Sequence, residues 1–125
     1  MYSVDFFQTP EVADKLMAAA EFPVVADVQT DPELAELLAA LSLETSWSDR
    51  QNAARKLGYM HSQEAVPALL VALPADPFWM VRTAIIQALE LIGDPAAILT
   101  LEAVAVNDSF QVVRSYAAKA VERLS

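Results

Sequence analysis

Apolar side chains in the second half of the chain recur at the spacing of an α-helix. Within residues 78–92 the recurring positions are Val81, Ile85, Ala88, Leu89 and Ile92, which predict a helix over about 78–92. A second apolar series, Ile98, Leu101 and Ala105, predicts a helix over about 95–106. Gly93-Asp94-Pro95 separates them: glycine accepts a positive φ, aspartate caps a helix, and proline suits the first helical turn. The pattern therefore predicts a pair of consecutive helices.

The same pattern predicts further helices on both sides of this pair. Upstream we expect helices at about 47–59 and 64–74, with a break at His61-Ser62 and Pro67 in the first turn of the second helix. Downstream, Asp108 or Ser109 can cap a final helix. Thr9-Pro10-Glu11 predicts a helix to about Ala20, and Asp31-Pro32-Glu33 predicts one to about Leu43, with an extended connector between. This makes about seven helices.

These helix pairs belong to an internal repeat. The segment DPFWMVR at 76–82 returns as DSFQVVR at 108–114, a shift of 32 residues. The same shift aligns Arg50, Arg82 and Arg114, and it places apolar residues on apolar residues without a gap through residues 31–125. Self-similarity at this period is typical of stacked-repeat proteins, in which each unit buries its apolar face against the next.

The repeated residues resemble the HEAT-like repeats of the phycobilisome-lyase type. The stretch DPFWMVRTAIIQALELIGDPAAILTLEAV at 76–104 follows that pattern, SDRQNAARKLGYMHSQEAVPALLVAL at 48–73 replaces its Gly-Asp with His61-Ser62, and 108–125 is a half copy. The resemblance implies an all-α fold, a short right-handed α–α superhelix whose second helices line the concave face. It also implies a possible role in handling a bilin on phycobiliproteins. Fold resemblance alone does not fix function.

Length and composition place the chain among single-domain proteins. Its 125 residues fit one domain, 1–125, with an acidic N-terminal cap region and connector over 1–30 and the repeats over 31–125. The final helix, and the one expected near Thr9, each have one apolar stripe and a polar opposite side, as the end helices of a solenoid do. We therefore expect a complete small protein.

Charge restricts the partners. The net charge is −9, and residues 1–44 hold nine acidic side chains and a single lysine. Binding to nucleic acid or to an anionic membrane is disfavoured, because both need clustered Lys and Arg. We expect another protein as partner, whose surface is basic if the acidic region takes part. The N-terminus lacks the pattern of a secretory signal, which predicts a cytoplasmic protein.

Arg50, Arg82 and Arg114 predict a structural ladder. Each arginine occupies the same position in its repeat, and Asp76 and Asp108 are the expected carboxylate partners in the following repeat. An Arg–carboxylate pair can be bidentate and can fix the angle between stacked units. The alternative is that these arginines bind an anion or a carboxylate of a partner.

Two sets of residues are candidates for contact with a partner protein. Trp47 and Trp79 lie where one repeat passes into the next, and large aromatic residues there can anchor an interface. On the second helices, several small or apolar residues are predicted to point away from the core and to form a groove. The candidate groove residues are Ala68, Val71, Ala72 and Val104. The alternative for the tryptophans is packing between repeats. For the groove, the alternatives are that the acidic N-terminal segment, with Tyr2, Phe6 and Phe7, folds back over part of it, or that the alanines are an uninvolved surface.

The residues that carry catalysis or bind metals are scarce. The chain has no cysteine, two glycines and a single histidine, His61, which we expect on a surface loop. We therefore predict no catalytic residue, no metal site and no cofactor. The sequence predicts a non-enzymatic protein-interaction module. The alternatives are a phycobilin-lyase-like accessory subunit and a homodimerising structural protein.

Overall fold

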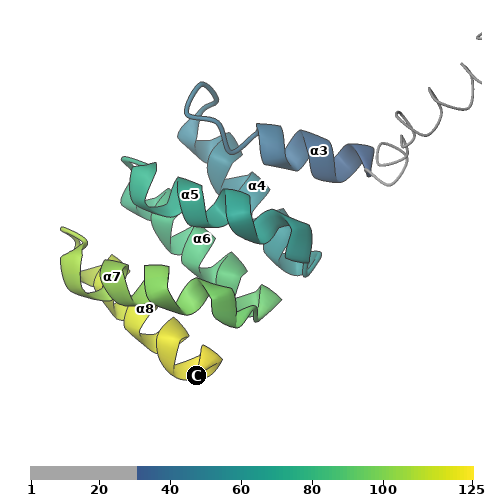
Figure 1. Ribbon diagram of the computed structural model, residues 1–125. Coiled ribbons are helices and arrows are strands. Elements are labelled where there is room, and N and C mark those ends of the chain that lie inside the picture. Colours follow the sequence, from purple (N-terminus) through teal and green to yellow (C-terminus); the bar gives the residue numbers. More distant parts are fainter. Residues whose placement is uncertain (1–30) are drawn as a thin grey trace, which may run out of the picture. The chain divides into compact units, whose positions relative to one another are not determined.

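The computed structural model describes residues 31–125, shown in Figure 1. The predictions for residues 1–30, including the helix from Thr9-Pro10 to about Ala20, lie outside the described residues. The chain divides into two units at Ala35/Glu36, and the second unit is Glu36–Ser125. The α-helices of the described part are α3 (Pro32–Ala39), α4 (Trp47–Tyr59), α5 (Val66–Ala75), α6 (Trp79–Ile92), α7 (Ile98–Asn107) and α8 (Gln111–Leu124). Short 3₁₀ turns, Gln63–Ala65 and Pro95–Ala97, precede α5 and α7.

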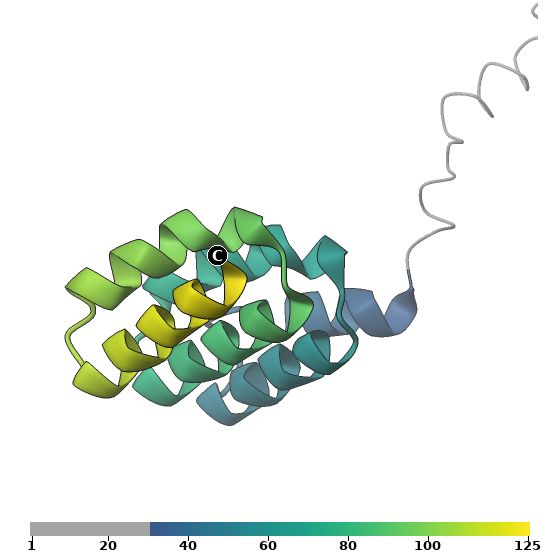
Figure 2. The same ribbon diagram turned by 90° about the horizontal axis from the view of Figure 1, so that it is seen from below.

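The helices of residues 36–125 form two layers, as expected for an α–α solenoid. Helices α4, α6 and α8 lie side by side in one layer, and α5 and α7 lie in the other (Figure 2). Within the described residues there is no strand, so the all-α prediction is confirmed. The largest fully buried side chains lie between the layers, and they are Leu57, Leu69, Leu73, Ile85, Ile86, Leu89, Leu101, Val81 and Val113.

The predicted repeat register is visible in the burial of α4, α6 and α8. Ala53, Ile85 and Ala117 occupy equivalent positions, and all three are buried. Ala54 and Ile86 are also fully buried, whereas the equivalent Ala118 on α8 is exposed. In the first two helices this position is covered by the next repeat, and among the described residues no further repeat covers α8.

The break between α6 and α7 forms as the sequence predicts. Gly93 ends α6 with a left-handed φ of 79°, and its N–H donates to the Leu89 carbonyl. The Asp94 side chain accepts a hydrogen bond from the Ala96 N–H at 2.9 Å. The equivalent break after α4 also contains a residue with a positive φ, but this residue is not a glycine. His61 takes a φ of 53°, and the buried Ser62 hydroxyl has no hydrogen-bond partner among residues 31–125.

Two local predictions need correction. Helix α3 ends at Ala39 rather than near Leu43, because the chain turns through 40–46 and the Thr45 hydroxyl donates to the Ala40 carbonyl at 2.9 Å. The N-cap residue of α8 is Phe110, and its side chain makes no capping bond. The Asp108 carboxylate instead accepts a hydrogen bond from the Phe110 N–H at 2.9 Å. This bond closes a turn just before the helix.

Candidate protein-interaction surface

The arginines of consecutive repeats connect the repeats to one another. Arg50 donates from Nε and Nη2 to the two carboxylate oxygens of Asp76, at 2.7 and 3.1 Å. Its Nη1 donates backward to the Thr45 carbonyl at 2.7 Å. Both charged side chains are almost completely buried. A buried bidentate pair of this kind holds two repeats at a defined angle, because neither charge can be left unpaired away from water.

The next arginine repeats this arrangement. Arg82 donates from Nε and Nη2 to Asp108 at 2.7 and 2.9 Å, and its Nη1 donates to the Asp76 backbone carbonyl at 2.9 Å. Asp76 is therefore bound through its side chain by one arginine and through its backbone by the next. Arg114 makes the backward contact as well, from Nη1 to the Asp108 carbonyl at 2.7 Å. The three arginines form one continuous ladder along the repeats.

The environment of Asp108 alters its ionisation. Burial by itself raises the pKa of this carboxyl. The hydrogen bonds from Arg82 and from the Phe110 N–H, together with the charges of Arg82 and Arg114, outweigh burial, so the pKa lies below its ordinary value. Asp108 is thus held as the carboxylate that the ladder requires.

Aromatic side chains line the same edge as the ladder. Trp47 stacks on Phe78 with ring centroids 6.0 Å apart, and Trp79 stacks on Phe110 at 6.1 Å. The guanidinium of Arg50 lies 5.8 Å from the centre of the Phe78 ring, and Arg82 makes the equivalent contact with Phe110. Trp47 and Trp79 remain 37% and 38% exposed. Both tryptophans therefore pack against the next repeat and still offer ring surface to a partner.

A shallow groove of about 650 Å³ lies between the end of α3 and helix α5. Its lining is predominantly apolar and includes Leu38, Leu41 and Leu43 on one side and α5 on the other. Among the predicted groove residues, Ala68, Val71 and Ala72 line it together. The groove ends at the ladder residue Asp76.

A second groove, of about 500 Å³, lies between α5 and α7 and repeats the first. The α5 residues that line the first groove are Pro67, Ala68, Val71, Ala72, Ala75 and Asp76. Adding 32 to each number gives the residues from α7 to Asp108 that line the second, namely Leu99, Thr100, Ala103, Val104, Asn107 and Asp108. Opposite them, Ser42 in the first groove corresponds to Pro74 in the second. The exposed face thus follows the same repeat as the core.

One predicted groove residue needs correction. Val104 touches the second groove but is only 8% exposed, because its side chain packs into the core between α7 and the other layer. The most exposed apolar residues of α7 are Leu99 and Val106, which the prediction did not include. The 32-residue register contains the signal for both, since Leu99 and Val106 are the equivalents of the exposed Pro67 and Pro74 of α5.

Charge is divided between the two layers. Helix α5 has no charged residue, and α7 has a single one, the exposed Glu102. All seven Lys and Arg residues of 45–125 lie on α4, α6 and α8. The face formed by α5 and α7 is therefore apolar, with no basic side chain to attract an anionic ligand.

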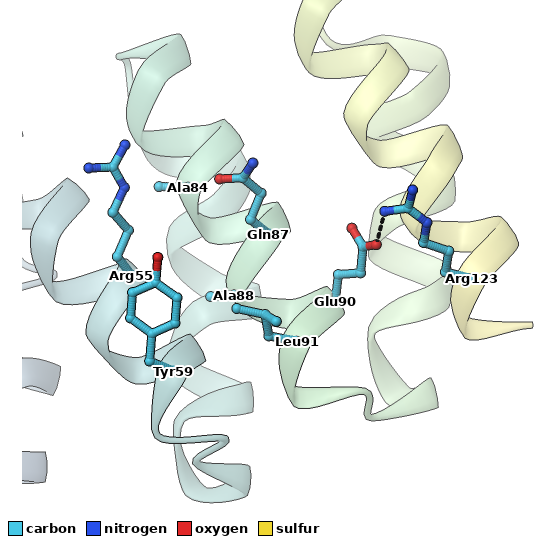
Figure 3. Close-up of a pocket in the computed structure, with 8 residues that line it drawn as sticks. All are labelled: Arg55, Tyr59, Ala84, Gln87, Ala88, Glu90, Leu91 and Arg123. Atoms are coloured by element: carbon cyan, nitrogen blue, oxygen red, sulfur yellow. Dashed lines mark hydrogen bonds and ion pairs between the residues drawn. The ribbon is translucent and has the colours of Figure 1, made fainter.

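The opposite layer has a different pocket, of about 460 Å³ (Figure 3). Arg55 and Tyr59 from α4, Gln87 from α6 and an ion pair between Glu90 and Arg123 surround it. Beside it, helices α4 and α6 approach closely, because Gly58 has no side chain and a Cβ there would lie 2.8 Å from the Ala88 Cα. The hydrogen bond with Glu90 is the main reason that the pKa of Arg123 is raised. This pocket is polar and mixed in charge.

The described part of the chain has neither a cluster of metal-ligating side chains nor a membrane-spanning helix. Residues 31–125 contain no group of three or more His, Cys, Asp or Glu side chains that could hold a metal ion. No helix in that range is long and apolar enough to cross a membrane.

Comparison with known proteins agrees with the repeat architecture. The model of the family described as HEAT repeats matches residues 34–122. Two curated relatives are similar over part of the chain, both named bilin biosynthesis protein PecE. The protein from Mastigocladus laminosus is 47% identical over 49 residues, which are 39% of this chain and 18% of the relative. The protein from Nostoc sp. is 44% identical over 52 residues, which are 42% of this chain and 21% of the relative.

The chain thus spans about a fifth of the length of the curated relatives that it matches. The match to the HEAT family, by contrast, covers most of the chain and both layers of the fold. The chain belongs to the HEAT repeat family, with repeats of the phycobilisome-lyase type.

Proposed function

We propose that this protein is a non-enzymatic interaction module that binds a partner protein on the face formed by α5 and α7. The observation that carries the proposal is the pair of apolar grooves related by the 32-residue repeat. Val71, Leu99 and Val106 on this face are 73%, 79% and 75% exposed. Large exposed apolar side chains gathered on one face are typical of interaction sites.

The shape of the face favours a partner helix. Parallel grooves between α-helices accept the apolar side chains of an amphipathic helix, which recur every three or four residues. The small side chains of Ala68, Ala72 and Ala103 let the partner approach closely. Because the ladder and the core hold α5 and α7 in place, little conformational entropy is lost on binding. The acidic residues of 1–44 favour a partner with basic residues beside its apolar stripe.

The test compares wild type with two variants of equal charge change. Val71→Glu introduces a carboxylate into the apolar groove, whereas Gln87→Glu introduces one at an exposed position of α6 in the other layer. We expect a partner captured from source-cell lysate with wild type and Gln87→Glu and lost with Val71→Glu, while the circular dichroism of all three proteins stays the same. Identical captured proteins for all three would refute binding on this face.

The aromatic edge is a second part of the proposed interface. We expect Trp47→Ala/Trp79→Ala to weaken binding of the same partner, because both rings are partly exposed beside the ladder. Since each ring also stacks on a phenylalanine of the next repeat, the melting temperature of the double variant is measured alongside. Loss of stability with unchanged affinity would assign the tryptophans to packing alone.

The similarity to PecE supports an alternative function, an accessory role in bilin biosynthesis. In that case a linear tetrapyrrole added to the protein would show a shifted visible absorption band and increased fluorescence. Free-ligand spectra at saturating protein would rule out bilin binding by this chain. A further alternative is that the α5–α7 face binds a second copy. Light scattering over a range of concentrations would then show a dimer that Val71→Glu dissociates.

A further inference from the structure

The pocket between α4 and α6 has an apolar bottom beneath its polar groups (Figure 3). Its buried lining residues, Ala84 and Ala88, are both on α6, and the half-exposed Leu91 extends this apolar surface. Arg55 and Tyr59 line the pocket from α4, where a spacing of four residues places them on the same side of the helix. A guanidinium and a phenol hydroxyl therefore stand together beside an apolar surface.

The charge of Arg55 is not neutralised within the described part of the chain. The ion pairs among residues 31–125 join two ladder arginines to their aspartates and join Glu90 to Arg123, so none of them involves Arg55. The Tyr59 hydroxyl likewise makes no hydrogen bond within that range. Because Glu90 is already paired with Arg123, the lining of the pocket carries one net positive charge.

The repeat indicates that the fold does not require this arginine or this tyrosine. Adding 32 to their numbers gives Gln87 and Leu91, which occupy the equivalent positions of α6. Arg55 and Tyr59 are both exposed, so neither contributes to the core between the layers. Stacking of the repeats therefore does not account for the guanidinium and the hydroxyl at this pocket.

A second pocket, between α6 and α8, shows how the equivalent place differs one repeat later. Its volume is about 260 Å³, against about 460 Å³ for the first pocket. Tyr116 occupies the position of the small Ala84, and no aliphatic side chain lines the second pocket. Its lining residues are Gln87, Glu90, Tyr116, Lys119 and Arg123. Only the first pocket combines an unpaired cation with an apolar bottom.

We propose that the pocket between α4 and α6 binds a carboxylate carried on a small apolar body, as in a free organic acid or the last residue of a peptide. Arg55 donates to both carboxylate oxygens, Tyr59 donates from its hydroxyl, and the apolar body covers Ala88 and Leu91. Charge-assisted, bidentate hydrogen bonds make arginine well suited to a carboxylate. A phosphate group, with close to two negative charges, matches this single cation less well. A volume of about 460 Å³ lies within the usual range for small-ligand pockets.

The test is a titration of the full chain with 3-phenylpropionate, followed by nuclear magnetic resonance of the backbone amide groups. We expect saturable shifts of the Ala88 and Leu91 signals with a dissociation constant on the order of 1 mM, as is usual for a ligand of this size. The neutral 3-phenylpropionamide has the same ring and lacks the charge. It should bind at least about tenfold more weakly, because the contacts with Arg55 are lost.

The informative variant is Arg55→Gln/Tyr59→Leu, which gives α4 the residues that α6 has at the equivalent positions. It should retain the circular dichroism of wild type and weaken binding of 3-phenylpropionate at least about tenfold. Lys56→Gln is the matched control, because Lys56 is an exposed cation of α4 that does not line the pocket. This control should bind as wild type does.

Shifts that do not saturate, equal binding of the amide, or undiminished binding by the double variant would overturn the inference. N-acetylphenylalanine distinguishes the two sources of the carboxylate, because it carries the same ring and the backbone of a terminal residue. Tighter binding than that of 3-phenylpropionate would assign the pocket to a peptide terminus, and weaker binding would assign it to a free acid. The pocket and the α5–α7 face lie on different layers, so the result is independent of the proposed function.

Discussion

Replacement of Arg82 by alanine tests whether the ladder holds the repeats together. The substitution removes two hydrogen bonds to Asp108, one to the Asp76 carbonyl and a contact with the Phe110 ring. It leaves the Asp108 carboxylate without its main partner in a place where the side chain is only 8% exposed. Removing one member of a buried ion pair typically destabilises a protein by about 3–5 kcal/mol. We expect a value in the lower part of this range, because Arg114 still lies near Asp108.

Urea denaturation followed by circular dichroism measures this effect. Domains of this size have free energies of unfolding of about 5–15 kcal/mol, so a loss of about 3 kcal/mol is easily resolved. In thermal unfolding it corresponds to a drop of more than 10 °C, at roughly 4 °C or more for each kcal/mol. Arg55→Ala is the control, since Arg55 is exposed on α4 and should change stability by less than about 0.5 kcal/mol. A loss below about 1 kcal/mol for Arg82→Ala would refute the structural role of the ladder.

Three further predictions concern stability. Gly58→Ala should lower the free energy of unfolding by about 1–2 kcal/mol in urea denaturation, because the new Cβ would lie 2.8 Å from the Ala88 Cα. This steric cost should exceed the benefit of alanine's better helix propensity. A gain in stability would contradict the close packing of α4 against α6. His61→Gly should raise the free energy of unfolding by about 0.5 kcal/mol, because glycine adopts the positive φ at this position without strain. Gly93→Ala should lower it by about 1 kcal/mol, because it places a Cβ on a residue with a positive φ. Equal effects of the two substitutions would refute the strain argument. Because the pKa of Asp108 is lowered on folding, its contribution to stability is present above the unfolded pKa of about 3.9 and is lost as the pH falls through the folded pKa. Asp108→Asn should accordingly flatten the loss of stability below about pH 4, and an unchanged pH profile would argue against this assignment.

The sequence predicted helix positions closely where the apolar spacing and the residues that begin or end a helix agree. Helix α4 spans Trp47–Tyr59 as expected, and α6 begins within one residue of its predicted start. Gly93 and Asp94 end one helix and begin the next with the φ and the capping bond that their chemistry favours. The error at the end of α3 has a different origin. Apolar spacing continues past Ala39, but hydrogen bonds within the following turn stop the helix, and spacing does not reveal such bonds.

The candidate surface could be predicted less fully. The repeat identified Ala68, Val71 and Ala72, because residues on the exposed side of a helix follow from its periodicity. Val104 was misplaced, since the side of α7 that faces the other layer depends on the rotation of the helix in the packed protein. The register aligns Leu99 and Val106 with Pro67 and Pro74, but the exposure of these positions depends on the packed structure.

The sequence by itself determined that this protein is a helical repeat with a period of 32 residues and that its arginines and aspartates recur in register. Those properties depend on local propensity and on the spacing of like residues, both of which can be read along the chain. Only the tertiary structure decided which donors meet which oxygens: Arg50 and Arg82 each bind the carboxylate of an aspartate 26 residues further along and a backbone carbonyl five or six residues back. The reason is that a hydrogen bond depends on the relative placement of two repeats, which follows from how their cores pack.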